Sequence, residues 1–324
     1  MKELIYTSLI LTALCSCEVD ITDNFRDQQN LFVVSGQVVA GEAPLISLSR
    51  TIAMAEVDTL LFLNEALVEI AQDDRQFILD PIGEGFYINE ELLPRPGDVL
   101  SLACTGEELP QASIRTTVPE FPEVTNIDFQ VGDTFNFSLD VSIQDPASTL
   151  DHYSFYIKGW RREIVHHHDW ESGEEWVDTS NIFMAYNLSF SDPVMEYTGG
   201  PRQFSFYDLN DPWGQYFHFS DKEINGTEHT ISISDHLWRF YNDTIPEIYV
   251  HMVKRDVHYF NFIESYIHYD PYPEQDFFQS VQVYSNIDGG FGLFTAESRV
   301  VDTIDLSEWF NDPDFLELMN PVPD

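Results

Sequence analysis

The sequence predicts a mainly β fold, in which a β-sandwich is followed by a larger β-rich domain with at most one or two short helices. Three observations predict it. Short apolar runs, many of them alternating with period two, recur along the chain. Clusters of Gly, Pro, Asn and Asp separate these runs, as turns between strands require. A helical spacing of apolar residues is sustained only over Val257–Tyr269, which Asp270-Pro271 ends.

We expect the first domain over residues 31–118, as a sandwich of roughly seven or eight strands. The runs predicted as strands are Leu31–Val34, Val38–Val39, Ile46–Leu48, Leu60–Leu63, Val68–Ala71, Phe77–Leu79, Gly85–Ile88 and Val99–Cys104. The predicted turns are Gly41–Pro44, Asp73-Asp74, Asp80-Pro81 and Arg95–Asp98. The order of these pieces resembles small Ig-like or prealbumin-like modules of envelope proteins. Such modules act as spacers or docking surfaces, so this resemblance implies no catalysis.

The larger β-rich domain is expected over residues 124–310, and residues 311–324 are expected as a C-terminal tail. Two prolines in Val118–Glu123 disfavour both helix and regular strand pairing, so we place the boundary there. The strands predicted beyond it are Phe135–Val141, His152–Ile157, Glu163–His168, Glu175–Met184, Gln203–Tyr207, His229–Ile233 and an aromatic stretch from Ile248.

The first residues have the pattern of a targeting segment. Lys2 supplies a positive charge, Leu4–Leu14 is a short apolar run, and Ser16 is a small residue that signal peptidases accept. Leu14-Cys15-Ser16-Cys17 resembles the bacterial lipobox, in which Cys17 fits the acceptor position. We therefore expect residues 1–16 as a signal peptide, lipidation of Cys17 and residues 17–30 as a lipidated tether. This predicts a lipid-anchored protein of the outer membrane, on its periplasmic or cell-surface face; plain secretion is the alternative.

The net charge and the cysteine content limit the kinds of partner and of site that we expect. The chain has 56 acidic and 15 basic residues, with a net charge of −41, so it would repel nucleic acid and anionic lipids. The membrane is therefore expected as a partner only through the N-terminal lipid. Cys104 lies in an alternating run and is interpreted as a small core residue rather than a redox or metal site.

The most chemically suggestive segment is His166–His168, followed by Asp169. If Ser172-Gly173 forms a two-residue hairpin turn, His167 lies opposite Asp178, and such a pair suits metal binding or a tuned histidine pKa. No third ligand is fixed by spacing, however. We favour a polar exposed hairpin, and whether it binds a metal stays open. No catalytic residue, metal ligand, cofactor or cofactor-binding residue is assigned, and we do not expect an enzyme.

Other motifs are weaker. His-Glu-x-x-His, Gly-x-Ser-x-Gly and a phosphate-binding glycine loop are all absent from the sequence. Gly289–Gly292 is interpreted as a tight turn, and Ser285–Gly290 as a structural corner packed into the sandwich. Asp208–Gly214 resembles a calcium loop, but Pro212 occupies a ligand position.

A family resemblance rests on segments spread over nearly the whole mature chain. They are the lipobox at Cys17, Leu45–Arg50, Thr116–Pro119, Phe217–Asp221 before Gly226, Tyr259–Ser265, Val283–Ile287 and Gly290–Ala296. Together they resemble a Bacteroidota lipoprotein family, domain of unknown function 4249. The resemblance implies an envelope lipoprotein, often encoded beside TonB-dependent outer-membrane receptors, with no established enzyme activity. The His-rich hairpin is not a feature of that family.

Two functional hypotheses lead, and a third stays open. The favoured one is a noncatalytic binding or accessory component that works with a TonB-dependent receptor in capturing an unknown ligand. The second is a metal-assisted hydrolase centred on the His-rich hairpin, and the third is a purely structural surface protein. The sequence leaves the ligand and the oligomeric state undetermined.

Overall fold

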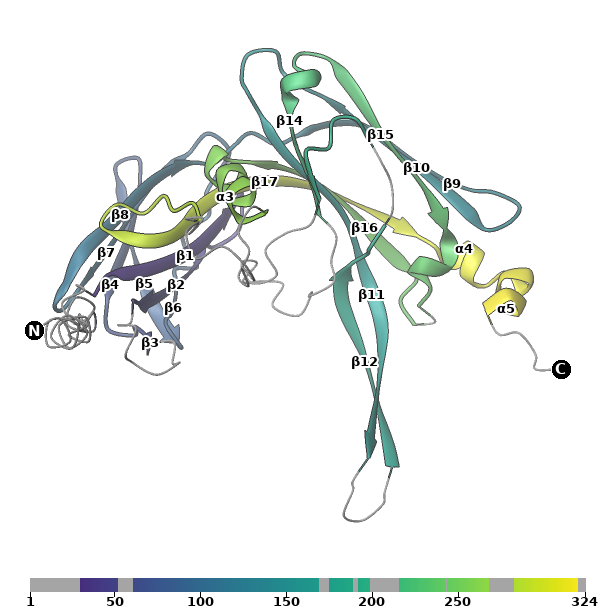
Figure 1. The fold of residues 1–324 in the computed structure, drawn as a ribbon, viewed down its shortest axis with the longest axis horizontal. Helices are drawn as coiled ribbons and strands as arrows, with labels where there is room; N and C mark the ends of the chain where they lie inside the picture. Colours follow the sequence, from purple (N-terminus) through teal and green to yellow (C-terminus); the bar gives the residue numbers. More distant parts are fainter. Residues whose placement is uncertain are drawn as a thin grey trace, which may run out of the picture.

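The computed structural model describes residues 30–51, 61–168, 175–188, 192–198, 216–242, 244–267 and 283–319. It confirms the predicted fold class, because strands dominate and an N-terminal β-sandwich precedes a larger β-rich region. Twelve strands follow one another in the sheet order β13-β14-β11-β16-β17-β1-β2-β6-β5-β4-β7-β8, with β12 and β3 paired to its members, and β15-β10-β9 form a separate sheet (Figure 1). None of the described helices is long and apolar enough to cross a lipid bilayer.

The N-terminal sandwich is built from eight strands and the first half of β17. The eight are β1 (Phe32–Val39), β2 (Leu45–Arg50), β3 (Leu61–Phe62), β4 (Leu67–Gln72), β5 (Arg75–Gly83), β6 (Phe86–Ile88), β7 (Val99–Gly106) and β8 (Leu109–Thr117). The first half of β5 pairs with β4 and its second half pairs with β6, so this strand connects the two layers. Alternate side chains of β1, β4 and β7 point inward, and Phe32, Val68 and Leu100 are fully buried between the layers.

Most expected strands of this region are confirmed, with two differences. Leu31–Val34 and Val38–Val39 belong to one strand, β1, and β8 was not predicted. The turn expected at Asp80-Pro81 is wrong, because both residues lie within β5. The strand register shifts between Pro81 and Gly83, and such a bulge accommodates a residue that lacks an N–H group. The expected turns at Gly41, Asp73 and Gly97 are confirmed by their positive φ angles.

The larger region packs two sheets around a second core. Its strands are β9 (Glu123–Val131), β10 (Asn136–Gln144), β11 (His152–His168), β12 (Glu175–Ala185), β13 (Tyr197–Thr198), β14 (Phe217–Ser220), β15 (Glu228–His236), β16 (Glu247–Arg255) and β17 (Gly290–Asp305). Apolar residues of β10 and β15 face those of β11, β14 and β16, and among the fully buried ones are Leu139, Ile231, Phe155, Phe219 and Ile248.

Short helices close this region. They are the 3-10 helices η1 (Asp221–Glu223) and η2 (Leu237–Phe240) and the α-helices α3 (Val257–Ile267), α4 (Ser307–Phe310) and α5 (Pro313–Met319). The helix expected from Val257 is confirmed as α3, which packs Phe262 and Ile263 against Leu293 of β17. Within residues 313–319, part of the expected tail, Phe315 is fully buried in the second core.

Strand β17 joins the two regions, as Figure 1 shows by its course across the molecule. Its first half pairs in parallel with β1, from Phe32↔Gly290 to Val39↔Glu297, and its second half pairs antiparallel with β16. The close approach depends on Gly292, which has φ +115°, because a Cβ there would lie 1.8 Å from the carbonyl oxygen of Val34. Residues 290–305 therefore serve both cores, although the sequence placed them with the larger domain.

Candidate functional site

The most distinctive feature outside the two cores is a two-stranded arm. It consists of Trp160–His168 of β11 and Glu175–Phe183 of β12, and it projects away from the rest of the molecule (Figure 1). Nine residues of extended chain span about 30 Å. The arm is thus comparable in length to a small domain, but it is only two strands wide.

The arm arises where β11 loses its other neighbours. Up to Gly159, β11 pairs with β16, and residues 152–155 also pair with β14. Beyond Gly159, β12 is its one partner among the described strands. The base is fixed by packing, because Tyr186 covers Gly159 and donates a hydrogen bond to the carbonyl oxygen of Trp160 at 3.3 Å. Trp160 also packs against Phe183 across the ribbon, with ring centroids 5.2 Å apart.

Both faces of the arm expose apolar side chains. Val165 and Trp176 lie on one face, because Trp176 pairs with His167, which is two residues from Val165 along β11. Their exposed fractions are 39% and 48%. Ile164 and Val177 lie on the other face, with 53% and 51% exposed. The sequence predicted an exposed hairpin here, but a polar one, so the apolar side chains on both faces are a difference from that prediction.

Two histidines of the arm, His167 and His168, each contact a carboxylate. His167 Nε2 lies 2.9 Å from Asp178 Oδ2, and the His167 ring stacks on Trp176 with centroids 5.0 Å apart. His168 Nδ1 lies 3.1 Å from Glu175 Oε1. The predicted contact between His167 and Asp178 is therefore confirmed. The predicted register is wrong by two residues, since His167 lies opposite Trp176 and reaches Asp178 diagonally on the same face.

Metal chemistry on the arm finds little support in this geometry. The two histidine–carboxylate pairs are separate, and where side chains are described no group of three ligands forms on the arm. The side chain of His166 and the expected turn at Ser172-Gly173 lie outside the described residues. Each pair offers one histidine and one carboxylate, and two ligands do not make a closed zinc site.

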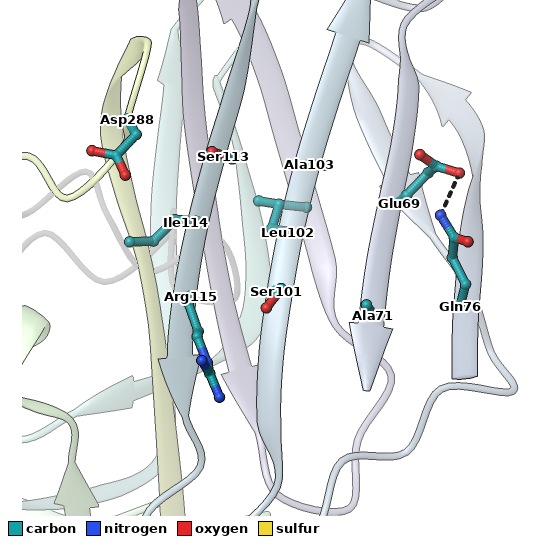
Figure 2. Close-up of a pocket in the computed structure, with 10 residues that line it drawn as sticks. All are labelled: Glu69, Ala71, Gln76, Ser101, Leu102, Ala103, Ser113, Ile114, Arg115 and Asp288. Carbon is teal, nitrogen blue, oxygen red and sulfur yellow. Dashed lines mark hydrogen bonds between the residues drawn. The ribbon is translucent and has the colours of Figure 1, made fainter. Parts of the chain in front are cut away.

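A shallow trough lies on the surface of the N-terminal sandwich. Figure 2 shows it across neighbouring strands, with a floor of small side chains and polar groups at its edges. Its cavity volume is about 330 Å³. The floor includes Ala71, Ser101 and Ala103, while Glu69 accepts a hydrogen bond from Gln76 at 2.8 Å along one edge. No histidine lines it, so the trough lacks a serine–histidine pair.

The remaining predicted positions divide between buried residues and undescribed segments. Cys104 is fully buried in β7, which confirms it as a core residue, and burial raises the pKa of its thiol to about 12. The corner at Ser285–Gly290 is confirmed as structural, because Ile287 joins the first core and Gly289 has φ +75°. Cys17 and the loop Asp208–Gly214 lie outside the described residues.

Comparisons with known proteins add little to this geometry. No protein-family model and no curated protein matches the chain. Among solved structures, the FN1-FN3 domains of chicken CNTN1 match with 10% identity and a TM-score of 0.21, over 68% of this chain and 57% of that one. The collagen adhesin CNA from S. aureus matches with 10% identity and a TM-score of 0.22, over 85% of this chain and 95% of that one. TM-scores this low carry no argument about function.

Proposed function

We propose that this chain is a noncatalytic binding or accessory lipoprotein of a bacterial outer membrane, and that its arm docks into a TonB-dependent receptor during ligand capture. The observation that carries this proposal is the exposure of Ile164, Val165, Trp176 and Val177 on a ribbon that has no third strand among the described residues. The lipid on Cys17 would hold the protein at the same membrane as its receptor.

A ribbon of this kind gains little stability of its own in water. Two-stranded ribbons are at best marginally stable alone, and apolar side chains exposed on both faces add an unfavourable contact with water. A partner that covers the arm removes that exposure. Tryptophan is among the residue types that most often dominate the binding energy of an interface, and Trp176 is half exposed on the arm. Because both faces are apolar, we expect a partner that surrounds the arm rather than a flat surface.

The charges of the arm define the partner further. Residues 163–178 include six acidic residues and no Lys or Arg, and the two arginines of the arm, Arg161 and Arg162, lie at its base. The whole chain carries a net charge of −41, so a partner with a similar charge would be repelled. We therefore expect a receptor cavity with an apolar lining and a basic rim, in which an unpaired strand edge of the arm can add to the partner's sheet.

Removal of the arm tests this proposal. Residues 161–182 can be replaced by Asn-Gly, since Trp160 and Phe183 are directly opposed and a two-residue turn can join them. We expect the parent protein, purified in mild detergent from membranes of its own host, to bring a receptor in equal amounts, and the shortened protein to bring none while its melting temperature stays near that of the parent. Ile82→Ser, which changes an exposed residue on the N-terminal sandwich, is the matched control and keeps the partner. A receptor retained by the shortened protein would refute the docking role of the arm.

The anchor is tested separately. Cys17→Ser removes the thiol that would carry the lipid, so we expect the protein to move from the detergent-rich phase to the aqueous phase in a detergent-separation assay. Cys104→Ser serves as the control, because a buried core thiol cannot anchor the chain, and this variant remains in the detergent-rich phase. Equal partitioning of the parent and Cys17→Ser would remove the lipid from the proposal.

A further inference from the structure

Three carboxylates lie close together in the larger region, at the end that is remote from the arm. Asp145 follows β10, Asp151 immediately precedes β11, and Asp221 opens η1 after β14. Each offers one oxygen atom, and the three oxygens lie within 4.8 Å of one another. The side chains are buried, with 1%, 8% and 0% of the three residues exposed, so water does not separate their charges.

The described ion pairs leave this cluster short of positive charge. Lys254 pairs with Asp151, which also accepts a hydrogen bond from the Thr149 hydroxyl at 3.0 Å. Asp145 accepts hydrogen bonds from the Tyr153 hydroxyl at 2.7 Å and from the Gly226 N–H at 3.0 Å, and both donors are neutral. One ammonium group thus faces three carboxyl groups, and like charges this close disfavour full ionisation unless a cation joins them.

A second observation concerns Asp221 alone. Its Oδ2 accepts a long hydrogen bond from Asn225 Nδ2 at 3.3 Å. Its Oδ1 has less than 1 Å² exposed and accepts no hydrogen bond within the described part of the chain. Buried carboxylate oxygens almost always have a partner, so this oxygen requires an explanation, which is either a bound cation or a proton on the carboxyl group.

We propose that Asp145, Asp151 and Asp221 bind a divalent cation, and that the ion is Ca²⁺. All three ligand atoms would be carboxylate oxygens, which suits a hard cation. Ca²⁺ binds six to eight oxygens at about 2.3–2.6 Å in a flexible geometry, and three carboxylate oxygens within 4.8 Å of one another can share one such ion. Mg²⁺ requires a strict octahedron at about 2.0–2.1 Å and keeps several of its waters, so a buried set of three carboxylates suits Ca²⁺ better.

The ion would hold together parts of both sheets. Asp145 and Asp151 bracket the connection from β10 to β11, and Asp221 lies between β14 and β15. Strands β10 and β15 belong to the small sheet, whereas β11 and β14 belong to the large one. A cation bound by all three carboxylates would therefore fix the packing of the two sheets at this end. This site is independent of the proposed docking arm, which occupies the other end of β11.

Calcium titration of the full mature chain in mild detergent tests the proposal, after treatment with a chelator and removal of the chelator. By calorimetry we expect one saturable Ca²⁺ site with a Kd between about 10 µM and 1 mM, and binding of Mg²⁺ at least about tenfold weaker. Saturating Ca²⁺ should raise the Tm by about 4 °C or more. Asp221→Asn should abolish the saturable site, and without Ca²⁺ this variant should melt above the parent because one buried negative charge is gone.

The control separates this site from general attraction of cations to an acidic surface. Asp133→Asn changes an exposed carboxylate in the turn between β9 and β10 and should leave the saturable site intact. Weak, non-saturating heats that Asp221→Asn does not alter would overturn the proposal. So would a parent with no response to Ca²⁺, which would favour a proton on Asp221. Should Asp221→Asn fail to fold, Asp145→Asn provides the same comparison.

Discussion

Asp256 shows how one side chain can connect several elements. It lies between β16 and α3, and its Oδ1 accepts a hydrogen bond from the Tyr259 N–H at 2.9 Å, which caps the helix. The same carboxylate accepts hydrogen bonds from the hydroxyls of Thr116 and Thr295, both at 2.6 Å, and from the Ala296 N–H at 2.8 Å. Strands β8 and β17 and helix α3 therefore meet at one charged group.

Loss of the Asp256 carboxylate should destabilise the fold. Asp256→Ala removes a helix cap and leaves three further buried donors without an acceptor, so we expect the free energy of unfolding to fall by about 3 kcal/mol. Urea denaturation followed by tryptophan fluorescence measures the change. Asp133→Ala, at an exposed turn, is the control and should change the free energy by less than about 0.5 kcal/mol. A loss below about 1 kcal/mol for Asp256→Ala would contradict the role assigned to it.

The thiol of Cys104 is buried in the first core. Its pKa is raised from 9.0 to about 12 by burial, so the unfolded chain releases the proton at a lower pH than the folded chain. This contribution to stability is complete below pH 9 and is lost as the pH rises toward 12. In a chain that starts at residue 18, we expect Cys104 to be unreactive toward a thiol reagent at pH 8 and to react on unfolding. Fast reaction of the folded chain would show that the thiol is accessible.

Residues such as Cys104 and Gly289 were predictable because their signals are local. An alternating pattern identifies an inward-facing side chain, and a glycine between turn-forming residues identifies a positive φ angle. The Asp145, Asp151 and Asp221 cluster was not predictable in this way. Two of its members are close in sequence, but the third comes from a segment 70 residues further on and meets them only through strand pairing.

Among the elements, the arm is a pair of strands that exposes apolar side chains on both of its faces. Its four exposed apolar side chains keep 39–53% of their surface in contact with water, so its stability depends on backbone pairing between β11 and β12 and on cross-strand contacts such as that between His167 and Trp176. Substitutions on the arm should therefore affect binding and stability to very different extents.

A substitution of two exposed apolar residues of the arm should separate its effect on binding from its effect on stability. Ile164→Thr with Val177→Thr keeps β-branched residues in the strands but removes apolar surface from one face of the arm. We expect the free energy of unfolding to change by less than about 0.5 kcal/mol and the affinity for the membrane partner to fall at least about tenfold, because binding would have buried those side chains. Ile78→Thr, which changes an exposed residue of β5, is the control. Unchanged affinity of the double variant would argue against contact through this face.

The sequence predicted elements more reliably than their extent. It divided β11 into His152–Ile157 and Glu163–His168, since the polar and small residues between them weaken the apolar pattern. It missed β9, whose inward face is only partly buried and whose alternation begins directly after Pro122. The departure of the arm from the sheet depends on where β16 and β14 stop pairing, and no residue within the arm specifies that.

At the scale of the whole molecule, β17 makes the two cores depend on each other. Phe294 and Ala296 belong to the first core, while Leu306, directly after the strand, belongs to the second. Near the junction, Arg255 of β16 pairs with Glu297 of β17, and Gln37 of β1 donates to the same carboxylate. Parallel pairing of β1 with a strand about 260 residues away leaves no local signal, so the sequence could not predict this arrangement.

Gly292→Ala tests this dependence. A methyl group at Gly292 would collide with the carbonyl of Val34 and would also need a strained φ of +115°, so we expect a loss of about 3 kcal/mol or more in the free energy of unfolding. Because β17 serves both cores, the parent and the variant should each unfold in one transition by calorimetry. Two separated transitions, with only the first shifted by the substitution, would show that the cores are independent.

Site-specific photo-crosslinking in intact cells tests most directly whether the arm enters a receptor. A photoreactive phenylalanine analogue at position 177, on the arm, is compared with the same analogue at position 82, an exposed site on the N-terminal sandwich. We expect position 177 to crosslink to one outer-membrane receptor and position 82 to give no such product. Absence of a crosslink from the arm, or the same receptor captured equally from both positions, would contradict docking through the arm.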